Sequence, residues 1–264
     1  MGFLSNLFGK KSAEVTSAKL NELANADRKV STLDDLEPFR RTCWLPILED
    51  RDGDITGSKF AGIPYLAPDE EWPECPNCGN PIQLFVQLNS SELPAESGKP
   101  WGDGLLQFFY CTNRDPMCDV DCSAWAPFAK STVLRIVPIG ESTPRYDVSP
   151  VLEPFPPRLI RGWMAMDDLP NWEEQKMYGV ELSDSEADEV SETYPRGGEK
   201  LMGWPCWIQG VEYPNCPECG SPMGHVFQID SEGALPFMFG DVGIGHITLC
   251  PKHTSILAFG WACS

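Results

Sequence analysis

The chain has 264 residues, 42% of them hydrophobic, which is enough for an apolar core and argues against disorder. Its 23 glycines and 25 prolines favour turns and short strands over a helical bundle. The net charge of -19 would repel phosphate backbones, which argues against a direct nucleic-acid ligand. The same charge would attract a basic protein or simply keep the chain soluble.

The first eleven residues, M-G-F-L-S-N-L-F-G-K-K, combine a short apolar run with two lysines at its end. This run is too short for a secretion signal, and its charges follow the apolar part instead of preceding it. No stretch approaches the roughly 18 apolar residues of a membrane span. We therefore expect a cytoplasmic protein without a membrane span. In a reducing compartment, its 11 cysteines indicate metal ligation rather than disulfides.

Residues 12–40 place apolar side chains at roughly helical spacing among Ala, Lys and Glu. They predict one or two short helices in an N-terminal helical segment, residues 1–40. Ser31 or Thr32 is expected to cap a second helical turn, which Pro38 limits. Such a helix packs on the rest of the chain or, as the functional alternative, docks a partner.

A shift of the chain by 141 residues aligns it with itself. Eleven of the thirty positions in 59–88 are identical after this shift, where ordinary residue frequencies of about 5–7% would give about two. The match includes C-P-N-C-G-N-P at 75–81 and C-P-E-C-G-S-P at 216–222. It continues, with one gap, from 102–111 to 240–250. These matches predict an internal duplication.

The predicted fold class is α+β, mainly β, with two copies of a β-rich unit around a pseudo-twofold axis, short N-terminal helices and zinc knuckles. The first repeat spans residues 41–150, the linker and acidic segment 151–198, and the second repeat 199–264. A strand is expected over 131–139. The acidic stretch 181–198 is expected to form a solvated loop or a short surface helix, which a basic partner could use.

Each copy places a glutamine in an otherwise apolar strand, Gln87 in the first and Gln228 in the second. A buried amide must be hydrogen-bonded, so we expect bonds to the backbone of a loop or of the other copy. A peptide-binding role for the pair is the sharper alternative. His225 and His246 also lie in apolar strands, where core histidines are commoner than catalytic ones.

The second copy contains a complete set of metal ligands. A C-x-x-C turn presents two thiolates from one knuckle, and a second pair at a strand end closes a tetrahedral site of the kind that zinc prefers. The glycine after the second cysteine suits a tight turn. We predict a structural Zn²⁺ bound by Cys216, Cys219, Cys250 and His253.

The first copy offers five thiols for the four coordination positions of one metal ion. Cys75 and Cys78 form the knuckle, and Cys111 stands at the equivalent strand end. The alignment puts Cys118 in the place of the histidine, and Cys122 competes with it. We predict a second structural Zn²⁺ held by four thiolates, with the choice of the fourth left open.

Each of the two predicted ligand sets fills all four coordination positions of its zinc ion, whereas a catalytic zinc keeps one position open for water. No hydrolase, P-loop or dinucleotide fingerprint occurs. We therefore predict that the chain is not an enzyme. The alternative is a hydrolase-like enzyme in the cleft between the repeats, with Asp103, Asp241 or His246 as acid or base, although turn aspartates more often bond their own backbone.

Over about residues 40–264 the chain resembles the bacterial YwqG-like family. The resemblance lies in K-F-A-G-I-P-Y-L and E-E-W-P within 59–73, L-F-V-Q-L at 84–88, L-M-G-W-P-C-W-I-Q-G at 201–210, V-F-Q-I-D at 226–230 and the C-terminal F-G-D-V-G-I-G-H-I and F-G-W-A-C-S. More faintly, the chain is similar to eukaryotic programmed-cell-death-two type ribosome-biogenesis proteins, which share the duplicated unit with its C-x-x-C knuckles.

The resemblance implies a duplicated β-rich fold that binds proteins. The eukaryotic relatives look like dedicated chaperones of a ribosomal protein, and bacterial members are often proposed as immunity proteins against secreted toxins. Many YwqG-like chains lack the cysteines, so the metal sites rest on ligand spacing. We expect a non-enzymatic, zinc-stabilised binding module, an immunity protein or a dedicated chaperone, whose client is a basic toxin domain or ribosomal protein.

Overall fold

The computed structural model describes residues 31–140 and 146–264, so the part of the expected N-terminal helices before residue 31 lies outside it. The first described element is the 3-10 helix η1 (Leu33–Phe39). Thr32 caps it, because the Asp35 carboxylate accepts a hydrogen bond from the Thr32 backbone N–H at 2.8 Å. The expected capped turn is thus confirmed, with Pro38 near its end.

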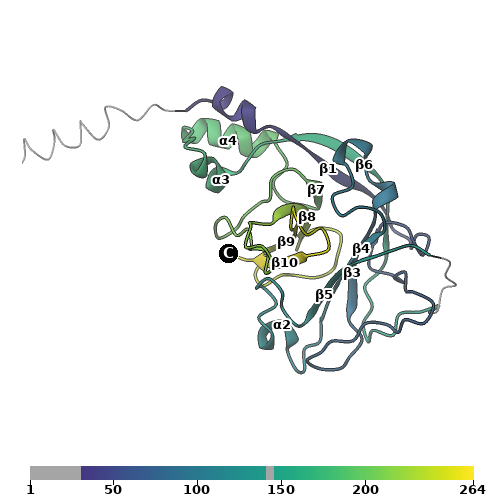
Figure 1. The fold of residues 1–264 in the computed structure, drawn as a ribbon. Helices are drawn as coiled ribbons and strands as arrows, with labels where there is room; N and C mark the ends of the chain where they lie inside the picture. Colours follow the sequence, from purple (N-terminus) through teal and green to yellow (C-terminus); the bar gives the residue numbers. More distant parts are fainter. Residues whose placement is uncertain (1–30, 141–145) are drawn as a thin grey trace, which may run out of the picture.

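Ten strands of the described residues form one antiparallel sheet, in the order β10-β9-β8-β7-β1-β6-β2-β3-β4-β5 (Figure 1). The prediction of a mainly β protein is confirmed, and the strand expected over 131–139 is β5. The strands are β1 (Arg41–Glu49), β2 (Lys59–Phe60), β3 (Gln83–Asn89), β4 (Leu105–Tyr110), β5 (Thr132–Val137), β6 (Arg158–Asp168), β7 (Lys200–Met202), β8 (Gly224–Asp230), β9 (Ile244–Leu249) and β10 (Leu257–Ala262).

The two ends of the sheet approach each other, so the sheet is nearly closed and barrel-like. The Trp261 backbone N–H on β10 donates to the carbonyl of Trp125, in the loop before β5, at 3.1 Å. The Trp261 indole N–H donates to the hydroxyl of Tyr110 at the end of β4, also at 3.1 Å. Near-closure leaves little unpaired strand edge exposed to other chains.

The two longest strands, β1 and β6, pair with each other in the middle of the sheet. We call β1–β5 the first half of the sheet and β6–β10 the second half. β1 also pairs with β7, and β6 pairs with β2. The first strand of each half therefore lies against the second strand of the other half. β6 falls inside 151–198, the segment expected to be a linker. Only Ile160 and Asp168 among its residues are buried, so its sequence lacks the regular alternation of apolar and polar residues that marks a half-buried strand.

One aromatic core joins the two halves of the sheet. Phe108 on β4 and Phe259 on β10 lie with ring centroids 4.2 Å apart, and Phe85 on β3 lies 5.0 Å from Phe237. Three of these rings are buried and Phe237 is partly buried, together with apolar residues from both halves. Because burial of such a side chain stabilises a fold by about 1.5–3 kcal/mol, this shared core holds the halves together.

The remaining elements are short. α3 (Trp172–Met177) and α4 (Asp184–Thr193) lie beside η1 on one side of the molecule, and α2 (Cys118–Asp121) lies on the opposite side (Figure 1). η2 (Ser90–Glu92) and η3 (Ala95–Ser97) follow β3. α4 forms from the acidic stretch as a surface helix, capped by Ser183. No helix of the described part is long and apolar enough to cross a membrane.

Candidate metal centres and the repeated polar network

The first cysteine pair lies in a tight knuckle before β3. The Cys75 N–H donates to the Asn80 carbonyl, and the Gly79 N–H donates back to the Cys75 carbonyl, both at 2.8 Å. Gly79 has a φ of 71°, a left-handed conformation that glycine adopts at little cost. The turn holds Cys75 and Cys78 on the same side of the loop.

Two further thiols complete this first cluster. Cys111 directly follows β4, and Cys118 begins α2; their sulfur atoms and those of Cys75 and Cys78 all lie within 4.8 Å of one another. Cys122 does not belong to this group of four. It lies at the end of α2, where its backbone N–H donates to the Cys118 carbonyl at 3.1 Å.

The second cluster repeats the same construction. The Gly220 N–H donates to the Cys216 carbonyl at 2.8 Å, and Gly220 has a φ of 68°. Cys250 directly follows β9, and its N–H donates to the Ile256 carbonyl at 3.0 Å. The ligand atoms of Cys216, Cys219, Cys250 and His253 all lie within 4.8 Å of one another.

His253 presents its Nδ1 atom to the sulfurs, 3.6 Å from Cys216 Sγ and 3.8 Å from Cys250 Sγ. Its Nε2 atom lies 3.6 Å from a carboxylate oxygen of Glu218, which stands inside the knuckle between its two cysteines. At this distance the two groups do not form a hydrogen bond.

The second cysteine of each knuckle lies among groups that favour the thiolate. Hydrogen bonds from Ser221, first from its backbone N–H and then from its hydroxyl, lower the pKa of Cys219 to about 6. For Cys78, burial raises the pKa, but the backbone N–H of Asn80 and the neighbouring thiols lower it further, so the net pKa is lowered. The thiolate is the form that binds metals.

The spacing of the donors fits tetrahedral coordination. A metal–sulfur length of about 2.3 Å gives sulfur–sulfur edges of about 3.8 Å and sulfur–nitrogen edges of about 3.6 Å. Cys78 and Cys111 have their sulfurs 3.8 Å apart, and Cys219 and Cys250 have theirs 3.7 Å apart. A disulfide would need about 2.05 Å. Each cluster therefore could hold one metal ion with four protein ligands.

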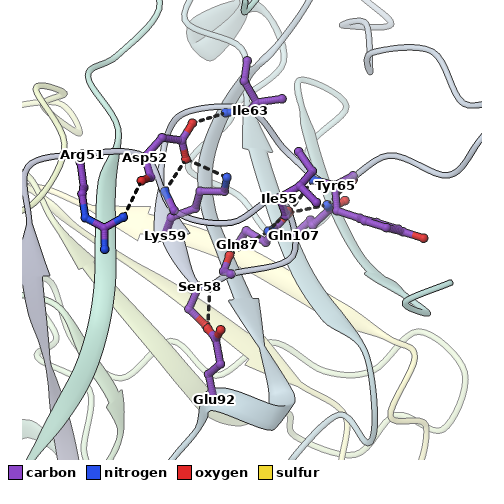
Figure 2. Close-up of polar contacts among 12 residues, drawn as sticks. Arg51, Asp52, Ile55, Ser58, Lys59, Ile63, Tyr65, Gln87, Glu92 and Gln107 are labelled. Carbon is purple, nitrogen blue, oxygen red and sulfur yellow. Dashed lines mark hydrogen bonds and ion pairs between the residues drawn. The ribbon is translucent and has the colours of Figure 1, made fainter. Parts of the chain in front are cut away.

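In the middle of β3, Gln87 is the centre of a polar network (Figure 2). Its carbonyl oxygen accepts the Tyr65 N–H at 2.9 Å and the Gln107 amide at 2.8 Å. Its amide donates to the carbonyls of Ile55 and Gly57 at 3.0 and 2.9 Å. The expectation that this glutamine bonds a loop backbone is confirmed, and these bonds occupy its polar atoms.

Gln228 repeats the three backbone contacts in the second half. Its carbonyl oxygen accepts the Cys206 N–H at 2.8 Å, and its amide donates to the carbonyls of Arg196 and Gly198 at 2.9 and 2.8 Å. Each partner is 141 residues beyond its counterpart in the first half. The offset found in the sequence therefore recurs in side-chain contacts.

A buried lysine adjoins each network, but its carboxylate partner differs. Lys59 binds Asp52, which lies just after β1 and has a side chain one-third exposed, at 2.8 Å (Figure 2). Lys200 binds Asp168, the last residue of β6, at 3.0 Å, and both side chains are 1% exposed. Sequence reasoning missed these pairs, although the matched lysines at a spacing of 141 were a usable signal.

The residues weighed for catalysis have different surroundings. Asp103 is exposed and bound to Lys99 at 2.5 Å, and Asp241 is exposed in the turn before β9. His246 is buried in β9, where burial lowers its pKa to about 3. His225 is also buried, with ring centroids 5.7 Å from His246.

The fold and the clusters thus define a mainly β protein with two cysteine-rich groups that could each hold a metal ion. The family model described as "Domain of unknown function (DUF1963)" matches residues 58–260, and the chain belongs to this family. The matched region includes every member of both clusters. No curated protein matches the chain.

Proposed function

We propose that this protein is a non-enzymatic binding module held together by two structural Zn²⁺ ions. The observation that carries this proposal is that each cluster offers four protein donors at tetrahedral spacing. Such a set leaves no coordination position for a reactive water, which a catalytic zinc needs. The ligands would be Cys75, Cys78, Cys111 and Cys118 in one site and Cys216, Cys219, Cys250 and His253 in the other.

We further propose that the chain is an internal duplication whose halves have exchanged their first strands. The shared offset of the Gln87 and Gln228 contacts supports this, as does the sheet order, which places β1 against β7 and β6 against β2. Each half would then need the other for a complete sheet. We also propose that the chain is a YwqG-like protein with a distant relation to programmed-cell-death-two type proteins.

The partner we propose is a basic protein, a toxin domain or a ribosomal protein, met in the cytoplasm. The net charge of -19 supports this, because a surface of one sign attracts and orients a partner of the other. α4 contributes acidic side chains at the surface next to α3. The protein would act as an immunity protein or as a dedicated chaperone.

Affinity capture of the full chain from its source cell at low salt, followed by mass spectrometry, tests this proposal. We expect one stoichiometric basic partner whose binding weakens as salt rises, because exposed charges are screened. Repeated recovery of the protein alone would contradict the proposal.

A matched variant tests the role of charge. Asp188→Asn, Glu189→Gln and Glu192→Gln together neutralise the exposed side of α4 and keep its Ser183 cap. We expect weaker capture and a smaller salt dependence with unchanged thermal unfolding. Unchanged capture would mean that α4 takes no part in binding.

A further inference from the structure

A pocket of about 650 Å³ opens at the second half of the sheet. β9 and β10 form one wall, and the loop that carries Trp125 forms another. The side chains that matter for its chemistry are Trp125, Trp207, Glu212, Tyr213, His246 and Trp261. The pocket therefore combines aromatic faces with an acidic group.

The matching place in the first half is filled by an arginine. Gln107 on β4 lies opposite Arg135 on β5, and the Arg135 Nε–H donates to the Gln107 carbonyl oxygen at 2.9 Å. The guanidinium also forms an ion pair with Glu70 and lies 5.5 Å from the centroid of Phe109. In the first half, the guanidinium of Arg135 therefore occupies the place next to Gln107.

In the second half, the equivalent pair of residues is His246 on β9 and Gly260 on β10. The equivalence follows from register, since Gln87 lies opposite Gln107 and Gln228 lies opposite His246. Gly260 has no side chain to take the place of Arg135. The Nε2 atom of His246 is buried and has no hydrogen-bond partner among the described residues.

The remaining walls of the pocket suit a flat cation. Trp207 and Tyr213 meet edge to face with centroids 5.0 Å apart, and Trp125 and Trp261 meet edge to face at 6.2 Å. Guanidinium groups stack on such rings and pair with carboxylates. Glu212, exposed at the pocket, supplies the carboxylate, whereas the residue 141 positions after Glu70 is Val211.

We propose that this pocket receives an arginine side chain of the basic partner, which takes beside His246 the place that Arg135 takes beside Gln107 in the first half. This inference rests on the proposed function, because it names the group through which the partner is recognised. Lysine would fit less well, since its compact ammonium lacks the planar face that stacks on tryptophan.

A direct test titrates the full-chain protein with the peptide acetyl-Gly-Arg-Gly-amide and follows tryptophan indole signals by NMR. The control peptides replace arginine by lysine or by citrulline, which has the same shape as arginine without its charge. We expect the arginine peptide to shift the signals of Trp125 and Trp261 and to bind at least five times more tightly than either control. Equal binding of all three peptides, or none, would overturn the proposal.

Variants locate the site. Glu212→Gln and Trp125→Ala should each weaken binding of the arginine peptide by at least five-fold, whereas Trp172→Ala, an exposed tryptophan on α3, should leave it unchanged. Thermal unfolding of each variant serves as the folding control. Equal weakening by Trp172→Ala would place the contact elsewhere and overturn the proposal.

The outcomes separate this inference from the proposed function. If a basic partner is captured but Glu212→Gln and Trp125→Ala do not weaken its capture, the protein is a binding module and the arginine pocket is wrong. If the arginine peptide binds as expected but no partner is captured, the pocket stands and the proposed function fails.

Discussion

The two halves of the sheet share a framework and differ in what they add to it. Gln87 and Gln228 make matching contacts, and both cysteine knuckles turn in the same way. The fourth member of the cluster is Cys118 in the first half and His253 in the second. The two buried lysines also bind carboxylates at different places in the fold. Finally, Arg135 lies opposite Gln107, whereas Gly260 lies opposite His246. The shared parts hold the fold, and the parts that differ are where a specific function can develop.

The largest effect is expected from the thiols that distinguish the first cluster. Cys118→Ser removes a proposed ligand and should cost a stabilisation on the order of 10 kcal/mol, comparable to the whole stability of a domain. The variant should lose one zinc ion, and the whole sheet should become less stable because its two halves share one core. Metal analysis and urea unfolding measure both effects.

Cys122→Ser is the matched control, only four residues away and outside the group of four. It should keep both ions and change stability by less than about 0.5 kcal/mol. Loss of a zinc ion in Cys122→Ser but not in Cys118→Ser would identify Cys122 as the fourth ligand.

The buried lysines sharpen the comparison between the halves. Lys200→Met leaves Asp168 buried without its partner and should cost about 3–5 kcal/mol, as for other broken buried pairs. Lys59→Met should cost less, because Asp52 is one-third exposed and regains water. Urea unfolding of both variants tests this order. Equal losses would mean that the exposure of the carboxylate does not govern the cost.

The second half also contains a buried carboxylate whose protonation should be visible. Burial raises the pKa of Glu174 above its ordinary value of 4.5. At pH values between 4.5 and this raised pKa, the folded state keeps a proton that the unfolded state has lost, so stability falls as pH rises through that window. The slope is at most about 1.4 kcal/mol per pH unit. Glu174→Gln should flatten it in unfolding experiments at several pH values.

Tyr213→Phe should have the opposite effect on the same titration. The Tyr213 hydroxyl donates to Glu174 at 2.6 Å, and this bond favours the charged carboxylate. Without it, the pKa of Glu174 rises further and the window in which stability falls becomes wider. An unchanged pH profile in both variants would contradict the assigned surroundings of Glu174.

The smallest effect is expected at the turns considered for catalysis. Asp103→Asn breaks only an exposed ion pair with Lys99, so stability should change by less than about 0.5 kcal/mol. Asp241→Asn tests the hydrolase alternative in the second half. Hydrolytic activity in the native protein that disappears in this variant, with unchanged folding, would favour an enzyme over a binding module.

The knuckles were predictable because coordination needs particular residue types at a fixed spacing. Both C-x-x-C turns and the later cluster members Cys111, Cys250 and His253 could be identified from the sequence. The choice between Cys118 and Cys122 could not, because both follow the same loop and only the position of α2 separates them. The bonding of Gln87 followed from the rule that a buried amide must be satisfied.

The middle of the sheet was not predictable in the same way. β6 lies within a segment without the period-two alternation of a half-buried strand, and its place depends on pairing with β1, more than 100 residues earlier. The pairing of Arg41 on β1 with Asp168 on β6 brings Asp168 near Lys200 on β7, whereas Asp52 stands only seven residues before its partner Lys59. The pocket at Gly260 likewise required the register between β9 and β10. Local patterns do not contain such long-range pairings.

The metal content of the native chain, purified without added zinc and without chelator, tests the central claim most directly. The account predicts two zinc ions per chain, falling to one in Cys118→Ser and, separately, to one in Cys216→Ser. A folded, monodisperse native protein that contains no metal would contradict it.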